Sequence, residues 1–240
     1  MNTGGGPPAP AAFIGDGARM PIWEFLQTYG ARIADGTLFT IAQFVLAACV
    51  AIMLALGAGL ARLSYNMALR GVATAYIEVF RGTSLLVQLY WIFFVLPLFG
   101  LTLDKFWAGF LSVGLNIGAY GAEIVRGAIK SVPKGQWEAG YALSLSPAQR
   151  MRRIILPQAL VLMLPPWGNL LIELLKGTAL VSLISVSDLM FQAKQINAST
   201  FLSAQAFGTA LIVYYLLARF LITPFMRWLE RAMARRLGRA

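Results

Sequence analysis

The sequence predicts an all-α, polytopic membrane protein with five transmembrane helices, and three observations carry this prediction. Of its 240 residues, 58% are apolar and only 12% are charged, and the mean hydropathy is +0.69. Soluble domains carry about 25% charged residues, so the polar shell of a soluble enzyme is missing. Apolar stretches also recur along most of the chain, and a bilayer core needs about 20 such residues per helix.

The predicted spans are separated by charged or turn-forming segments. The first carries no charge before Arg62, and the second lies between Arg81 and Asp104. In the fourth, Pro165 and Pro166 predict a loosened helix because proline lacks a backbone donor. A shorter apolar run at 178–186 is a candidate for a re-entrant or interfacial segment. The predicted boundaries are 37–61, 83–103, 106–122, 154–175 and 201–223.

The basic residues predict the orientation of the chain. Of the 20 basic residues, 14 follow the first, third and fifth spans, whereas the opposite side carries mixed charges. By the positive-inside rule, the N-terminus lies outside and the C-terminus is cytoplasmic. The net charge of +10 therefore indicates topology, and we expect no nucleic-acid partner.

The remaining segments flank a predicted membrane domain at 36–230. Residues 1–20 are rich in Gly, Pro and Ala and predict a disordered leader. Segment 21–35, with Trp23 and Tyr29, predicts an amphipathic segment on the outer surface, and 231–240 forms a basic cytoplasmic tail. A single cysteine and no histidine exclude an intrachain disulfide, a cysteine metal cluster and histidine catalysis. We predict no catalytic residue, metal or cofactor in this chain.

Segment 132–157 is long for a connector between two spans. Trp137 and small apolar neighbours predict a short surface helix, and Ser146-Pro147 predicts the start of a second helix. Two short exposed helices would form a knob that fits a groove in a soluble partner. The alternative is an interfacial elbow that lies on lipid headgroups.

This segment resembles the EAA loop of ABC importer permeases. The matching residues keep every spacing of that loop and are Glu138, Ala139, Gly140, Ser144, Ile154, Leu156 and Pro157. Residues 78–88, 119–127 and 175–180 are similar to the polar amino acid branch of the family, and the resemblance covers about 36–230. Two positions depart from the pattern, because Gly140 replaces an alanine and Ser144 replaces the turn glycine. Serine costs about 1 kcal/mol relative to glycine where a turn needs a positive φ.

The resemblance implies the transmembrane fold of a type I ABC importer in the cell membrane, most often the bacterial inner membrane. It also implies three partners: ATP-binding cassette ATPase subunits, a second permease subunit (a homologue or a copy) and an extracytoplasmic solute-binding protein. The chain has no G-x-x-x-x-G-K-[ST] phosphate loop, so ATP and Mg²⁺ belong to the ATPase and this chain is no enzyme. Segment 169–189 resembles permeases for ectoine and hydroxyectoine, which suggests a zwitterionic compatible solute.

Polar side chains inside the predicted spans are candidates for a transport pathway, because such residues usually face the interior of a bundle. Asn169, Glu173 and Lys176 recur at i, i+4 and i+7 and therefore share one helix face. They offer both charge signs to a zwitterionic solute; alternatively, Glu173 and Lys176 neutralise each other and Lys176 snorkels outward. The other pathway candidates are Gln88, Asn116, Tyr120 and Thr178.

Two pairs at i, i+3 spacing are candidates for an inner gate, namely Glu78 with Arg81 and Glu123 with Arg126. The alternative is a pair of ordinary surface ion pairs, which are usually weak. Two rival functions also stay open. One is a non-transporting membrane scaffold that recruits a soluble partner; the other is an ion-gradient-driven transporter, which the lack of a visible internal repeat disfavours.

Overall fold

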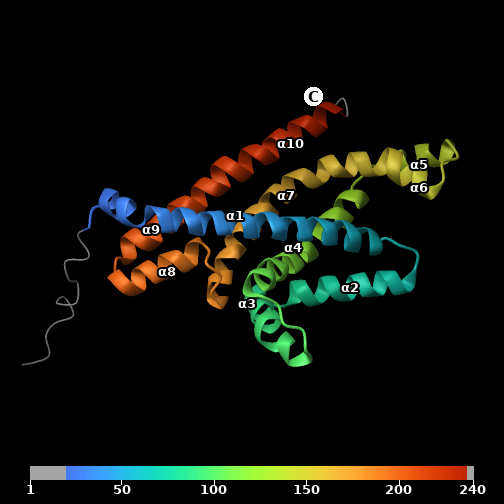
Figure 1. The fold of residues 1–240 in the computed structure, drawn as a ribbon. Coiled ribbons are helices and arrows are strands. Elements are labelled where there is room, and N and C mark those ends of the chain that lie inside the picture. Colours follow the sequence, from blue (N-terminus) through green and yellow to red (C-terminus); the bar gives the residue numbers. More distant parts are fainter. Residues whose placement is uncertain (1–19, 237–240) are drawn as a thin grey trace, which may run out of the picture.

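The computed structural model describes residues 20–236, and within that range the chain forms helices and turns without any strand (Figure 1). Residues 1–19 of the predicted leader and 237–240 of the predicted tail lie outside the described residues. In chain order, the α-helices are α1 (Ile22–Ala61), α2 (Met67–Gly82), α3 (Leu85–Tyr90), α4 (Lys105–Lys130), α5 (Lys134–Ala142), α6 (Pro147–Arg150), α7 (Leu156–Thr178), α8 (Leu189–Thr200), α9 (Ser203–Leu216) and α10 (Thr223–Arg236). Short π-helical or 3₁₀ segments join some of them: η3 (Trp91–Val95), η4 (Leu96–Phe99), η5 (Met151–Ile155), η6 (Ala179–Ile184) and η7 (Leu217–Ile222).

Within residues 20–236, four helical stretches are long and apolar enough to cross a membrane: Ile22–Ala61, Lys105–Lys130, Pro147–Ile184 and Ser203–Arg235. A fifth crossing arises if the bent pair Met67–Gly82 and Leu85–Phe99 counts as one span. The prediction of an all-α, multi-pass membrane protein is therefore confirmed.

Helix α1 does not divide into an outer segment and a span as the sequence predicted. It runs without a break for 40 residues, because segment 21–35 has buried side chains of its own. Phe25 and Ile33 pack with residues of α8 and α9 in a second apolar cluster. Gly36 lets α1 approach α8 closely, since a Cβ at position 36 would lie 3.0 Å from the Cα of Leu189.

The second span also differs from the predicted 83–103, because helix α2 precedes it and the chain then turns by 107°. Thr83 and Ser84 at the turn are extended, with ψ angles of 156° and 135°. Gly100, at a φ of 85°, ends the segment after η4. Hydropathy alone missed α2 because the arginines of this helix interrupt the apolar run.

Helix α4 lies at the centre of the fold and packs closely along α1 (Figure 1). Its glycines make this approach possible: a Cβ at Gly114 would lie 2.8 Å from the Cβ of Val50, and one at Gly118 would lie 2.9 Å from the Cβ of Leu54. Such stripes of small residues allow helix backbones to approach closely in membranes.

Helix α7 runs through Pro165 and Pro166, so the predicted loosening does not interrupt it. Both prolines lie on the exposed side of α7. The backbone hydrogen bonds that they cannot donate are therefore missing on that side and not on the side of α7 that packs against other helices. The apolar run after α7 forms the short η6, which ends at Ser185 with a φ of 60°. At the C-terminus, α9, η7 and α10 follow one another directly, so the predicted tail begins as helix.

Different helix ends lie at the two ends of the molecule. Helices α5 and α6, the last turns of α1 and the end of α10 point toward one end, and the start of α1 and the α8–α9 turn lie toward the other (Figure 1). The described termini therefore point in opposite directions (Figure 1).

Candidate functional site

A cavity of about 540 Å³, here called the polar cavity, lies where α3, α4, α7 and η6 meet. Four of the predicted pathway residues line it, namely Asn116, Tyr120, Glu173 and Lys176. The rest of the lining is apolar or glycine: Leu85, Ile117, Leu170, Gly177 and Leu180. Residues from two predicted spans are thus brought to one apolar-walled space with a few polar groups, which is the usual composition of a small-molecule site.

Glu173 and Lys176 form an ion pair in this cavity, with 2.8 Å between Lys176 Nζ and Glu173 Oε1. This geometry agrees with the alternative in which the two charges neutralise each other. Both side chains nevertheless remain more than 60% exposed. Exposed pairs contribute at most about 1 kcal/mol, so a solute with both charges can replace each partner at little cost.

Gln88 and Asn116 form hydrogen bonds at the break between α2 and α3. The amide nitrogens of both side chains donate to the carbonyl of Phe80, at 2.9 and 3.0 Å, and Asn116 also donates to Gln88 Oε1 at 3.1 Å. Gln88 donates in addition to the hydroxyl of Thr83 at 2.6 Å. These bonds satisfy a carbonyl that the broken helix leaves without a partner. Both residues therefore hold the bend beside the polar cavity, and only Asn116 lines that cavity.

Besides Gln88, two more predicted pathway residues lie outside the lining of the polar cavity. Asn169 is exposed on α7 and is not part of the lining. Thr178 is fully buried, and its hydroxyl donates to the carbonyl of Leu175 at 2.7 Å. The polar face predicted for α7 is thus brought into the cavity only at Glu173 and Lys176.

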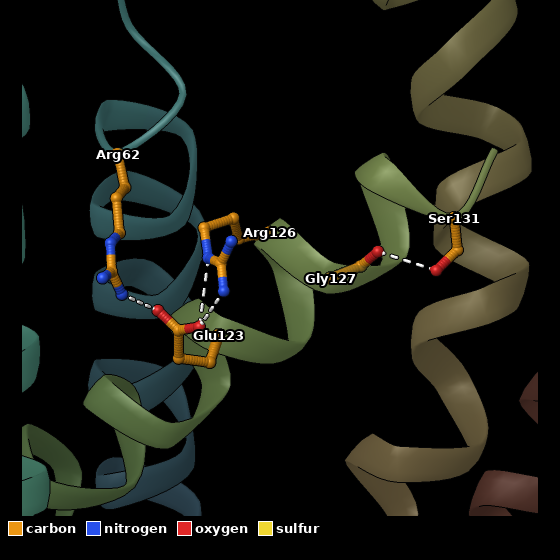
Figure 2. Close-up of polar contacts among 5 residues, drawn as sticks. All are labelled: Arg62, Glu123, Arg126, Gly127 and Ser131. Atoms are coloured by element: carbon orange, nitrogen blue, oxygen red, sulfur yellow. Dashed lines mark hydrogen bonds and ion pairs between the residues drawn. The ribbon is translucent and has the colours of Figure 1, made fainter. Parts of the chain in front are cut away.

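Of the two predicted gate pairs, only Glu123 with Arg126 forms, and it gains a third member (Figure 2). Arg126 Nε donates to Glu123 Oε2 at 3.0 Å, and Arg62, which follows α1, pairs with the other carboxylate oxygen. Figure 2 also shows the hydroxyl of Ser131 bonded to the carbonyl of Gly127 where α4 ends. No local sequence signal predicts the Arg62 contact, because 61 positions separate Arg62 from Glu123.

The predicted pair of Glu78 with Arg81 does not form within the described residues. Arg81 instead lies over the ring of Tyr120, 5.3 Å from its centroid, and the Tyr120 hydroxyl donates to the Arg81 carbonyl at 3.5 Å. Glu78 faces a different cavity, lined by α2 and by the ends of α1 and α4. The two side chains thus make different contacts, and Tyr120, which contacts Arg81, lines the polar cavity.

The long connector forms the two short helices that its sequence predicts, α5 and α6. Ser146 caps α6 in a reciprocal capping box with Gln149, and Pro147 follows in the first turn. At its base, Gln158 Nε2 donates to Gln136 Oε1 at 2.9 Å and so ties α5 to α7. Capping boxes of this kind satisfy two otherwise unpaired donors.

The residues of the EAA-like pattern divide between an exposed tip and a packed base. Glu138 and Ala139 are exposed on α5, and Tyr141 and Leu143 are 63% and 69% exposed. Ile154, Leu156 and Pro157 are half-buried at the base. The tip thus presents apolar and acidic side chains that are largely exposed.

The turn after α5 contains one departure from the family pattern, at Ser144. The N–H groups of Leu145 and Ser144 donate to the carbonyls of Gly140 and Tyr141, at 3.1 and 2.8 Å, which is the Schellman arrangement. Ser144 occupies the left-handed position of this motif with a φ of 52°. The positive φ anticipated at this turn is present, and Ser144 bears its strain.

Arg150 is a residue that sequence reasoning missed. Its side chain is only 5% exposed, lies 3.7 Å from the ring centroid of Tyr141, and stands 6.0 Å from that of Trp137. A Cβ at Gly140 would come within 2.7 Å of Arg150 Cδ. The second departure from the family pattern, glycine at 140, therefore makes room for the arginine.

The helical spans, the polar cavity and the exposed two-helix loop define a multi-pass membrane permease. The family of binding-protein-dependent transport system inner membrane components matches residues 51–235, and the chain belongs to this family.

Its relatives include amino-acid permeases. It is 45% identical to the probable amino-acid ABC transporter permease protein y4tF of Sinorhizobium fredii, over 75% of this chain and 78% of that protein. It is 38% identical to the L-cystine transport system permease protein TcyB of Bacillus subtilis, over 90% and 92%. It is 39% identical to the glutamine transport system permease protein GlnP of Escherichia coli, over 84% and 92%.

Solved structures give the same fold. The crystal structure of an amino acid ABC transporter with histidines is 33% identical and superposes with a TM-score of 0.82, over 89% of this chain and 99% of that one. An inward-facing structure of the MetNI methionine ABC transporter is 20% identical with a TM-score of 0.74, over 86% and 98%, and shares the fold alone. The predicted type I ABC importer fold is confirmed.

Proposed function

We propose that this chain is the permease subunit of an ATP-driven importer for a polar amino acid or a related zwitterionic solute. The observation that carries the proposal is the accessible Glu173–Lys176 pair in the polar cavity. The carboxylate of Glu173 would receive the ammonium of an amino acid, and Lys176 would receive its carboxylate. The amino-acid permeases among the relatives support this substrate class.

The finer substrate is a compatible solute, of which ectoine or hydroxyectoine is the candidate. The support is the likeness of segment 169–189 to permeases for these solutes. Asn116 and Tyr120 would complete the polar contacts of such a compact, zwitterionic molecule. Selection among solutes would rest mainly with the external solute-binding protein.

The partners in this proposal are two ATPase subunits, a second permease subunit and the solute-binding protein. ATP and Mg²⁺ would bind in the ATPase, and this chain would hydrolyse nothing. The exposed tip of α5, with Glu138 and Ala139, would dock in a groove of the ATPase. Closure of the ATPases around ATP would draw the two coupling loops together and open the cavity outward. Release of the hydrolysis products would return the cavity to the inward-facing state.

Uptake by the reconstituted complex tests the substrate site. Proteoliposomes with all subunits should accumulate the solute only with ATP, and Glu173→Gln should reduce uptake at least tenfold while the ATPase stays bound. The matched control is Glu24→Gln, which removes an exposed carboxylate from the first turn of α1 and should leave uptake unchanged. Normal uptake by Glu173→Gln would remove this residue from the pathway.

The same assay separates the rival functions. Uptake that persists without ATP and follows a Na⁺ or H⁺ gradient would establish a secondary transporter. Absence of any uptake, with the loop bound to a soluble protein other than an ATPase, would establish a scaffold.

Cysteine crosslinking tests the docking surface directly. Ala142→Cys, in a Cys49→Ser background, should crosslink to the purified ATPase, because position 142 is exposed beside the tip of α5. Ser203→Cys, exposed at the start of α9 toward the opposite end, is the control. Docking fails as a hypothesis if no position of the loop crosslinks, or if both variants crosslink equally.

A further inference from the structure

A second cavity, here called the basic cavity, has a volume of about 620 Å³ and lies between α2 and the C-terminal ends of α1 and α4. Four cationic side chains line it: Arg62, Arg70, Arg126 and Lys130. No residue lines both this cavity and the polar cavity, so the two cavities are separate.

The charges of the basic cavity are only half neutralised. Arg62 and Arg126 share the single carboxylate of Glu123 (Figure 2). Arg70 and Lys130 are exposed and make no ion pair within residues 20–236, and Glu78 is the one acidic lining residue. Four cations therefore face two carboxylates, which leaves an excess of two positive charges for an anionic ligand.

The cavity lies at the ends of two candidate membrane spans, where lipid headgroups are expected. Arg62 is the first charged residue after the uncharged stretch 37–61 of α1, and Lys130 is the last residue of α4. Both helices are candidate spans that end at this point. Basic pockets between transmembrane helices on the cytoplasmic side are suited to anionic lipid headgroups.

A neighbouring side of α2, whose residues do not line the basic cavity, favours a lipid over a free anion. Met67 at the mouth of the cavity is 76% exposed. Val72 and Val79 are 71% and 58% exposed, and their spacing of seven residues places them on one side of the helix. An acyl chain can lie along these side chains while its phosphate enters the cavity, whereas inorganic phosphate gains nothing from them.

We propose that the basic cavity binds the phosphate headgroup of an anionic phospholipid. Arg70 and Lys130 are the unneutralised cations of the cavity that contact the phosphate, and the acyl chains lie against the apolar side of α2. Only the assignment to the inner leaflet rests on the proposed function, through the cytoplasmic position of the coupling loop. Binding itself does not depend on transport, so a failed uptake assay leaves this proposal intact.

Native mass spectrometry of the detergent-solubilised permease, alone and with its ATPase, tests the proposal by titration with short-chain phosphatidylglycerol. Each basic residue near a membrane surface contributes about 1 kcal/mol to anionic lipid binding, so Arg70→Gln with Lys130→Gln should weaken binding about thirtyfold. Arg70→Lys with Lys130→Arg should retain it. The matched control is Arg227→Gln with Arg231→Gln, which removes two exposed cations from α10 and should bind as the wild type does.

Several outcomes would overturn the proposal. Equal retention of short-chain phosphatidylcholine would show that the negative charge is not recognised. Equal affinity for inorganic phosphate would make the cavity a free-anion site, and equal loss in both double variants would show unspecific attraction. Loss of lipid binding on assembly with the ATPase would assign the cavity to that protein partner.

Discussion

The guanidinium of Arg150 lies 3.7 Å from the ring centroid of Tyr141, and the aliphatic part of the same side chain takes the space that a side chain at position 140 would need. Arg150 has no acidic partner within the described residues, and its Nε has no hydrogen bond. A cation over an aromatic face is stabilised by the ring quadrupole, and more strongly when it is desolvated. The stack therefore replaces an ion pair in holding α5 against α6.

Gly140→Ala should weaken the coupling loop, because the new Cβ would meet Arg150 Cδ and Cγ at 2.7 and 2.8 Å. Overpacking of this kind costs about 1–3 kcal/mol. We expect lower ATPase stimulation by solute-loaded binding protein, with the spans unaffected. In an Arg150→Ala background the same change should cost little, and a double-mutant cycle measures the difference. Additive effects of the two substitutions would contradict the steric explanation.

Ser144→Gly should stabilise the turn after α5. Glycine adopts the φ of 52° without the Cβ strain that serine bears, which is worth about 1 kcal/mol. Hydrogen exchange at the amides of 144 and 145 should slow about fivefold, since these donors close the Schellman motif. Ser144→Ala should leave exchange unchanged, because it keeps the Cβ. Faster exchange in the glycine variant would refute the strain argument.

Gly114→Ala should separate α1 from α4, because a Cβ at this position would lie 2.8 Å from Val50 Cβ and 3.1 Å from the Ala47 carbonyl oxygen. The backbone oxygen cannot rotate away, so we expect a loss of about 1–3 kcal/mol in detergent unfolding. Gly127→Ala on the same helix is the control, since nothing lies within 4 Å of its Cβ. That variant should gain about 0.5–1 kcal/mol from helix propensity. Equal behaviour of the two variants would rule out close packing as the reason for Gly114.

Local sequence signals predicted those parts of the fold that depend on local forces. Ser146 and Pro147 predicted the start of α6, because capping and proline placement act within a single turn. The long apolar runs likewise predicted four of the crossings. Contacts between distant positions gave no such signal, and Arg62 reached Glu123 only through the packing of α1 on α4.

The candidate site was predicted in the same uneven way. The spacing of Glu173 and Lys176 predicted their shared face, and both side chains line the polar cavity. Gln88 and Asn116 instead bond to the carbonyl of Phe80 at a bend that hydropathy could not reveal. A polar side chain within an apolar run indicates that it has a partner, but it does not distinguish a solute from a broken helix.

Asp188 is buried between the predicted fourth and fifth spans and caps helix α8. Its side chain is fully inaccessible; Oδ1 accepts from the Phe191 N–H at 2.8 Å, and Oδ2 accepts from the Tyr214 hydroxyl at 3.4 Å. Burial raises the pKa of Asp188 from 3.8 to about 6, although the Phe191 and Met190 N–H groups, Tyr214 and the charge of Lys194 each lower it in part. Between about pH 4 and pH 6, the carboxyl of Asp188 therefore keeps its proton in the folded protein and releases it in the unfolded chain.

Asp188→Asn should remove this dependence on pH. In the wild type, the stabilisation from the bound proton is complete below about pH 4 and is lost as the pH rises through 6. Asparagine caps the helix without a charge at any pH. In detergent, the melting temperature of the Asp188→Asn variant should therefore match that of the wild type at pH 4 and exceed it at pH 7.5. The corresponding gain in the free energy of unfolding at pH 7.5 is at most about 3 kcal/mol. An asparagine variant less stable than the wild type at pH 7.5 would show that the ionised carboxylate is itself stabilising, as a charged cap of α8.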